Sequence, residues 1–209
     1  MPFLDVVALY SNIAVGPGSL IGENGDRSQK DWLQTTLTTI AAERQAGARK
    51  ALLFAVHHPP YSNGGHSGSP DMLADLDAAC AAASVQPDAV ISGHAHNYQR
   101  HTRRVQGKKV PFVVAGCGGH NDSRVDPADG QLSGDHSFDK SFKGFGYLTV
   151  TATPRRLKID FHKLGAQRPA DQRPPHLSNA KKAGGNDRGR RAAARPDRWL
   201  GRALKSSGG

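Results

Sequence analysis

The stretch "GHAHNYQRH" (Gly93–His101) decides how this 209-residue sequence is interpreted. It contains three histidines and follows "DAVISG" (Asp88–Gly93), a short apolar run that is typical of a buried strand. His94 and His96 are two positions apart, so both side chains can point the same way if the backbone is extended. Neutral imidazole is a versatile ligand for zinc, iron and manganese. The stretch therefore predicts a metal-binding loop at the end of a strand.

A second histidine-rich segment lies upstream, also at the end of a strand-like run. "KALLFAV" (Lys50–Val56) reads as a buried strand and is followed directly by "HHPPYSNGGH". Because open α/β sheets place their ligands beyond the carboxyl ends of the strands, we expect His57 to lie near His94 and His96 at one rim of a sheet. His58 is expected to point to the opposite side from His57, where packing or support is its more natural role.

The other strand-like segments complete an α/β pattern. They are Phe3–Ser11, Lys108–Gly116, and two alternating runs within Phe145–Lys163 that are split by "TPRR", a hairpin signal. In chain order, helix-like segments separate the first three strands, which are Phe3–Ser11, Lys50–Val56 and Asp88–Gly93. This alternation predicts a parallel sheet with right-handed crossovers. The later hairpins are expected to add antiparallel strands. The fold class predicted is therefore α/β.

Two segments carry helix signals. The first is expected to begin at Asp26, with Gln29 as its capping-box partner, and to end near Gly47. The second is expected to begin at Pro70, which suits the first turn of a helix, and to reach Val85. Each has apolar residues at helical spacing on one face, so each is expected to pack on the sheet.

Charge divides the chain into two parts. Residues 1–166 are nearly neutral, whereas residues 167–209 hold eleven Lys or Arg and three Asp, a net of +8. The second part lacks apolar periodicity, so we expect a structured domain at 1–166 and a basic, disordered tail at 167–209. No run approaches the eighteen apolar residues of a membrane span, and the first residues do not resemble a signal peptide. The compartment is left open.

Two motifs, in this order and at this spacing, resemble the calcineurin-like metallophosphoesterase superfamily in its purple-acid-phosphatase-like branch. "HHPPYS" matches H-x-P-x-Y, and "GHAHNYQRH" matches G-H-x-H-x-Y-x-R. The matching residues are His57, Pro59, Tyr61, Gly93, His94, His96, Tyr98 and Arg100. The resemblance runs from about residue 3 to 163 and covers the C-terminal half of such a domain. It implies part of a β-sandwich flanked by helices (α/β/β/α).

The resemblance also implies a function and roles for individual residues. His57 and His94 would bind one metal and His96 the other, in a dinuclear centre of divalent or mixed-valence Fe, Zn or Mn. His66 would contact the phosphate of a phosphate-ester substrate and protonate the leaving oxygen. A metal-bound hydroxide is the nucleophile in such sites. The chain would then be a phosphoric-ester hydrolase of the acid phosphatase type.

Part of the family's pattern is missing upstream of His57. The first half of the family's domain supplies metal-binding aspartates, one of which bridges the two ions, and an asparagine in a G-N-H-D motif. "GDRSQKD" at Gly25 and "GHND" at Gly119 are only partial matches, because the first begins a helix and the second lies downstream. We therefore expect an incomplete site and low activity. The alternative is a non-catalytic remnant, or a protein that binds nucleic acid weakly through its basic tail.

Overall fold

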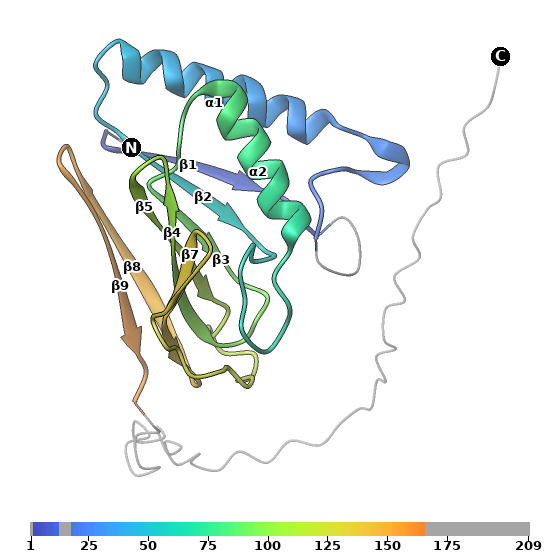
Figure 1. Cartoon of the computed structure of the whole chain (residues 1–209), viewed down its shortest axis with the longest axis vertical. Helices are drawn as coiled ribbons and strands as arrows, with labels where there is room; N and C mark the ends of the chain where they lie inside the picture. The colour runs from blue at the N-terminus through green and yellow to red at the C-terminus, as the bar shows by residue number, and fades with distance from the viewer. Residues whose placement is uncertain (1, 13–17, 166–209) are drawn as a thin grey trace, which may run out of the picture. The chain divides into compact units, whose positions relative to one another are not determined.

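The computed structural model describes residues 2–12 and 18–165. The basic tail expected at residues 167–209 lies outside the described residues. Within them, strands and helices follow one another in the predicted order (Figure 1).

A seven-stranded sheet is the centre of the fold. Its strand order is β1-β2-β3-β5-β4-β7-β6, and β1, β2, β3 and β5 are parallel. β4 pairs antiparallel with β5 and β7, and β6 with β7. The strands are β1 (Leu4–Leu9), β2 (Ala51–Val56), β3 (Ala89–Ser92), β4 (Tyr98–Val105), β5 (Lys108–Ala115), β6 (Leu132–Ser133) and β7 (His136–Phe142). The predicted parallel sheet is confirmed.

The second half of "GHAHNYQRH" was expected to be a loop, and this expectation is wrong. Residues from Tyr98 onward form β4, which is hydrogen-bonded on both sides, to β5 and to β7. The polar sequence "YQRHTRRV" hides this strand, because Gln99 and His101 are fully buried although they are polar. Burial of these polar residues depends on partners far away in the sequence, which local periodicity does not reveal.

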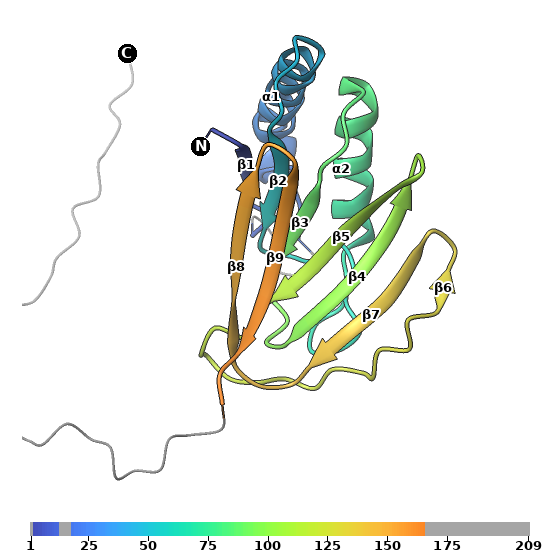
Figure 2. The same cartoon turned by 90° about the vertical axis from the view of Figure 1, so that its left-hand side faces the viewer.

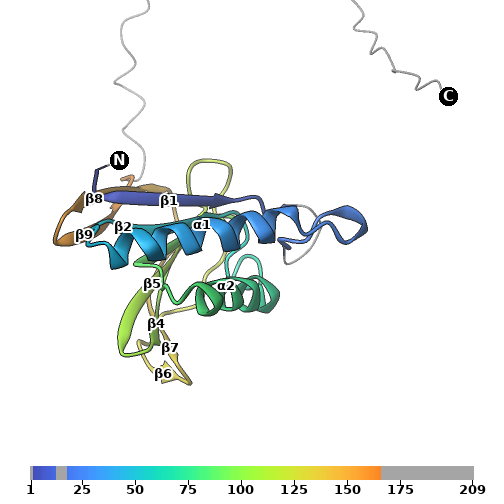
Figure 3. The same ribbon diagram turned by 90° about the horizontal axis from the view of Figure 1, so that it is seen from above.

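Both helices cover the same face of the sheet. α1 (Ser28–Gln45) and α2 (Pro70–Ala83) lie side by side, and both are below β1 in Figure 3. A short 3-10 turn, η1 (Glu23–Gly25), precedes α1. The main apolar core lies between the helices and the sheet. It includes Leu33 and Leu37 of α1, Met72 and Leu76 of α2, and Phe54 of β2.

The start of α1 differs from the prediction. α1 begins at Ser28, and the Asp26 carboxylate accepts hydrogen bonds from the Ser28 backbone N–H (2.9 Å) and hydroxyl (3.0 Å). Gln29 is not a capping-box partner, because its side-chain amide exchanges two hydrogen bonds with the backbone of Tyr10. Gln29 therefore ties the helix to the chain just beyond β1. α2 starts as expected at Pro70, and Ser69 is its N-cap.

The predicted C-terminal hairpin forms a second, two-stranded sheet. β8 (Gly146–Thr153) and β9 (Arg156–Lys163) pair antiparallel and lie across the face of the large sheet opposite to the helices (Figures 2 and 3). Leu53 of β2 packs with Val150 and Ile159 of the hairpin. Its two neighbours in β2 pack in the core on the helix side, so the strand contributes to both faces of the sheet. The described residues thus form helix, sheet and hairpin layers, which confirms the α/β class and a partial sandwich. A fourth, outer helical layer is not among them.

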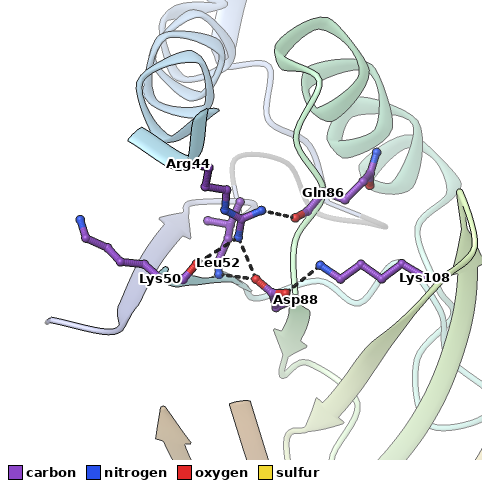
Figure 4. Close-up of polar contacts among 6 residues, drawn as sticks. All are labelled: Arg44, Lys50, Leu52, Gln86, Asp88 and Lys108. Carbon is purple, nitrogen blue, oxygen red and sulfur yellow. Dashed lines mark hydrogen bonds and ion pairs between the residues drawn. The ribbon is translucent and has the colours of Figure 1, made fainter. Parts of the chain in front are cut away.

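An ion-pair cluster fixes the strands at their amino ends, away from the histidines. The Asp88 carboxylate accepts hydrogen bonds from the Leu52 backbone N–H (2.7 Å), the Arg44 guanidinium (2.8 Å) and the Lys108 ammonium (2.7 Å), as Figure 4 shows. Arg44 also donates to the carbonyls of Gln86 and Lys50. Burial alone would raise the pKa of Asp88, but the hydrogen bonds from Lys108 and Leu52 outweigh burial and lower it. One carboxylate thus joins α1, β2, β3 and β5.

Cys80 and Cys117 are free and buried, and burial raises the pKa of the Cys80 thiol to about 12. Neither cysteine is therefore poised to act as a thiolate at neutral pH.

Neither of the two described helices combines the length and the apolar character that crossing a bilayer requires.

Candidate metal centre

His57 and His94 meet where two parallel strands end. Val56, the last residue of β2, is in register with Ser92, the last residue of β3. The next residues continue this alignment, because the Gly93 backbone N–H donates to the His57 carbonyl (3.1 Å). The rings are in contact, with 3.1 Å between His57 Nε2 and His94 Nδ1. Adjacent strand ends therefore place two imidazole nitrogens together from segments 37 residues apart.

His58 joins this pair, contrary to the expectation that it points away from His57. Its ring centroid lies 4.9 Å from that of His57 and 4.4 Å from that of His94. The cause is Ser11, beyond the end of β1, whose hydroxyl contacts both the backbone N–H of His58 (3.0 Å) and its Nδ1 (3.0 Å). This double contact holds the ring inward, where it is 2% exposed. Gly18 packs so closely that a Cβ there would lie 2.5 Å from the ring.

The three histidines offer a compact donor set. One ring nitrogen from each of His57, His58 and His94 lies within 4.8 Å of the other two. Three histidine nitrogens are a known protein ligand set for a single zinc ion that keeps a fourth position open. The contact between Ser11 and Nδ1 of His58 is the kind of outer interaction that fixes a ligand's tautomer. The residues present therefore fit one metal ion.

His96 does not belong to this cluster. Its Nδ1 lies in hydrogen-bond contact with Asn121 Oδ1, and its ring centroid is 4.9 Å from that of His120. The sequence allowed His94 and His96 to point the same way if the backbone is extended, but the backbone at His94 is not extended. His94 has a φ of 62°, in the left-handed region, so the chain turns between the two residues. Such strain in a non-glycine residue is typical of functional sites.

His66 lies between the two histidine groups. Its ring centroid is 4.1 Å from that of His94 and 6.0 Å from that of His96. It belongs to the loop between β2 and α2, whose glycines Gly64 and Gly65 both have positive φ. The chain thus returns after His57 to place a fourth imidazole beside the cluster.

Two buried polar residues of the β4 region fix the loop that carries His66. Asn97 Nδ2 donates to the Gly64 carbonyl (3.3 Å), and it reaches the loop after β5 at Ser123 Oγ (3.2 Å) and the Arg124 carbonyl (3.1 Å). Gln99 Nε2 donates to Ser62 Oγ (3.0 Å). Both residues are 0% exposed. Sequence reasoning missed them, although their place directly after the histidine pair was a usable signal.

Tyr98 and Arg100, the last two matching residues of the second motif, contact the hairpin side of the sheet. Tyr98 stacks on Phe161 of β9, with ring centroids 3.9 Å apart, and so holds the hairpin to the sheet. Arg100 lines a cleft between the hairpin and the sheet. The loop between the strand ends is closed by Gly116, where a Cβ would lie 2.2 Å from the Ala95 carbonyl oxygen.

The electrostatics of the cluster favour a neutral imidazole at His94. Burial, together with the neighbouring His58, His66, His57 and His96, lowers the pKa of His94 to about 4. A ring that stays neutral at pH 7 keeps a lone pair for a metal ion. The cluster found among the described residues consists of histidines alone, without a carboxylate. A second ion would therefore lack the bridging negative charge that offsets repulsion between two dications.

Comparison of the whole fold with known proteins identifies similar structures but no sequence relative. No family model and no characterised protein matches the sequence. The structure is similar to the purple acid phosphatase PPD1 from yellow lupin (Lupinus luteus) seeds, with a TM-score of 0.53 and 19% identity over 76% of this chain and 28% of that chain. GAP50, the anchor in the inner membrane complex of Plasmodium, matches with a TM-score of 0.46 and 15% identity over 79% of this chain and 50% of that chain.

The matched region thus spans under a third of the lupin enzyme and half of GAP50. The fold of the described residues is therefore similar to part of the purple acid phosphatase fold.

Proposed function

We propose that this chain is a metal-dependent phosphoric-ester hydrolase module whose own residues bind one metal ion. The observation that carries the proposal is the cluster of His57, His58 and His94, with 3.1 Å between the facing nitrogens of His57 and His94. The cluster lies at the carboxyl ends of parallel strands, where open α/β sheets bind ligands. The likeness of the fold to a purple acid phosphatase supports phosphate esters as the substrate class.

The histidines divide into a binding group and a reacting group. His57, His58 and His94 hold the ion, which supplies Lewis-acid stabilisation of a phosphoryl oxygen. His66, beside His94 and less enclosed by the fold, donates a hydrogen bond to the phosphate and passes a proton to the leaving oxygen. His96, held by Asn121, is the ligand for a second ion if a carboxylate from elsewhere completes that position. Because the cluster contains no carboxylate, this chain alone is expected to turn over slowly.

Metal binding is the direct test of the proposal. We expect the full chain, loaded with Zn²⁺ or Mn²⁺ and washed, to retain one ion per chain or less by elemental analysis. His94→Ala removes the central ligand and should abolish retention. His162→Ala is the matched control, because His162 is an exposed histidine on β9, outside the cluster. Retention that is equal in wild type and His94→Ala would overturn the metal site, and two tightly held ions would overturn the single-ion assignment.

Hydrolysis of an aryl phosphate tests the reaction separately. With p-nitrophenyl phosphate and Zn²⁺ or Mn²⁺, the chain should release phenolate slightly above the metal-only background. His57→Ala and His66→Ala should return the rate to background, whereas His162→Ala should not change it. If His66→Ala alone retains the rate, the proton-donor role of His66 is wrong. A chain that binds metal but gives no rate above background would refute the hydrolase function and leave the metal site intact.

A further inference from the structure

A basic cleft runs along the free edge of β9, away from the histidines. Two adjoining cavities of about 440 and 750 Å³ lie between the hairpin and the large sheet and share Tyr98, Arg100 and Ile159 as lining residues. One wall consists of β9, and the other consists of residues of β4, β5 and β7. Figure 2 shows β9 on the side of the hairpin nearer to these three strands.

Within residues 2–12 and 18–165, no strand lies beside the edge of β9 that faces this cleft. The hairpin is a two-stranded sheet there, in which β9 pairs with β8 alone. The Leu164 backbone N–H donates to the Phe145 carbonyl (2.9 Å), so in antiparallel pairing the backbone groups at positions 157, 159, 161 and 163 point away from β8. Ile159 and Phe161 are lining residues of the cleft. A strand laid beside β9 could therefore form hydrogen bonds to it.

Basic side chains outnumber carboxylates among the residues that line the cleft. Arg100 of β4 and Lys140 of β7 are direct cross-strand partners, and like charges in this arrangement destabilise a sheet. Lys109 of β5 lines the same cleft. Among the described residues, none of these three side chains forms an ion pair. The nearby carboxylates are engaged elsewhere, Asp139 with the hydroxyls of Thr102 and Ser137, and Asp160 with Lys158.

We propose that this cleft binds an extended acidic peptide segment of a partner protein, which adds a strand to the edge of β9. Strand addition supplies backbone hydrogen bonds, while alternate side chains of the bound segment face one wall. In this cleft that wall presents Arg100, Lys140 and Lys109, so acidic residues at alternate positions would neutralise the row.

Single-stranded nucleic acid fits these observations less well. Its binding sites stack bases on exposed aromatic faces. Here Tyr98 is 8% exposed and stacked on Phe161, and the ammonium of Lys163 lies 4.4 Å over the Phe142 ring. The aromatic faces are therefore occupied, whereas the backbone of β9 is available.

Lys140→Glu is the decisive variant, because it should stabilise the fold and at the same time weaken peptide binding. It places a carboxylate opposite Arg100, so the melting temperature should rise, and it removes charge from the cleft, so peptide binding should weaken. The probe is a fluorescein-labelled peptide of alternating Glu and Val with eight residues, the length of β9. Its binding to the full chain is measured by fluorescence anisotropy. We expect a loss of about fivefold in affinity, the upper range for one exposed ion pair.

Arg49→Glu is the matched control, because it makes the same change of net charge at an exposed residue outside the cleft. Its affinity should stay within about twofold of wild type, and this comparison also cancels any binding by the basic tail. Equal affinities of Lys140→Glu and Arg49→Glu would overturn the proposal, as would undiminished binding of a peptide N-methylated at alternate residues. Preferential binding of a labelled oligothymidine that Lys140→Glu abolishes would replace the peptide by nucleic acid.

Discussion

Burial of His101 should make the stability of this protein depend on pH. His101 of β4 is fully buried, its Nε2 contacts Gln99 Oε1 (3.2 Å), and its Nδ1 has no hydrogen-bond partner among the described residues. Its ring stacks on Phe138, with centroids 4.7 Å apart. Burial, together with the nearby His136, lowers the pKa of His101 from 6.5 to about 4, against a smaller opposing effect of Asp139.

The sign and size of the effect follow from linkage. The folded state resists protonation of His101, whereas the unfolded chain accepts a proton near pH 6.5. The stabilising contribution is therefore complete above pH 6.5 and is lost as the pH falls from 6.5 towards 4. The two pKa values correspond to about 3 kcal/mol in total, of which about 2 kcal/mol should be lost between pH 7.5 and pH 5.

His101→Phe isolates this contribution. Phe keeps the stacking on Phe138 and cannot be protonated, and Gln99 Oε1 still accepts the Asn63 backbone N–H (2.7 Å). Urea unfolding followed by circular dichroism at pH 7.5 and pH 5 should show that the variant loses about 2 kcal/mol less stability than wild type on acidification. His162→Phe, at an exposed position, should retain the wild-type dependence. If wild type and His101→Phe lose the same free energy, His101 is not the buried titrating group.

Three further predictions concern stability at single positions and can be measured by urea unfolding at pH 7. Asp88→Ala should lower the free energy of unfolding by about 2–3 kcal/mol, because it removes the carboxylate that Arg44, Lys108 and the Leu52 N–H share, whereas loss of the half-exposed Asp126 should lower it little. Gly116→Ala should cost more than about 2 kcal/mol, because its Cβ would overlap the Ala95 carbonyl; an unchanged midpoint would show that the histidine loop yields easily. Ser69→Ala should cost about 1 kcal/mol through loss of the N-cap bond to Met72, and Ser67→Ala, outside the cap, is its control.

The alternation of strands and helices, and the rim at which the histidines gather, could be predicted from local sequence patterns. Apolar runs of strand length separated by helix-like segments leave few arrangements besides a parallel sheet, and parallel strands end at one rim. This is why the meeting of His57 and His94 followed from two segments that are far apart in the chain. The hairpin at Phe145–Lys163 was equally clear, since its alternation and its turn are both local signals.

Which side chains join the cluster depends on long-range contacts that no local pattern predicts. His58 turns inward where the Ser11 hydroxyl, 47 residues away, contacts its ring. His96 lies outside the cluster, beyond the left-handed backbone of His94. β4 was hidden because Gln99 and His101 are buried in a polar network that long-range hydrogen bonds satisfy. Local periodicity records which residues avoid water, but it does not record the distant partners that let a polar residue be buried.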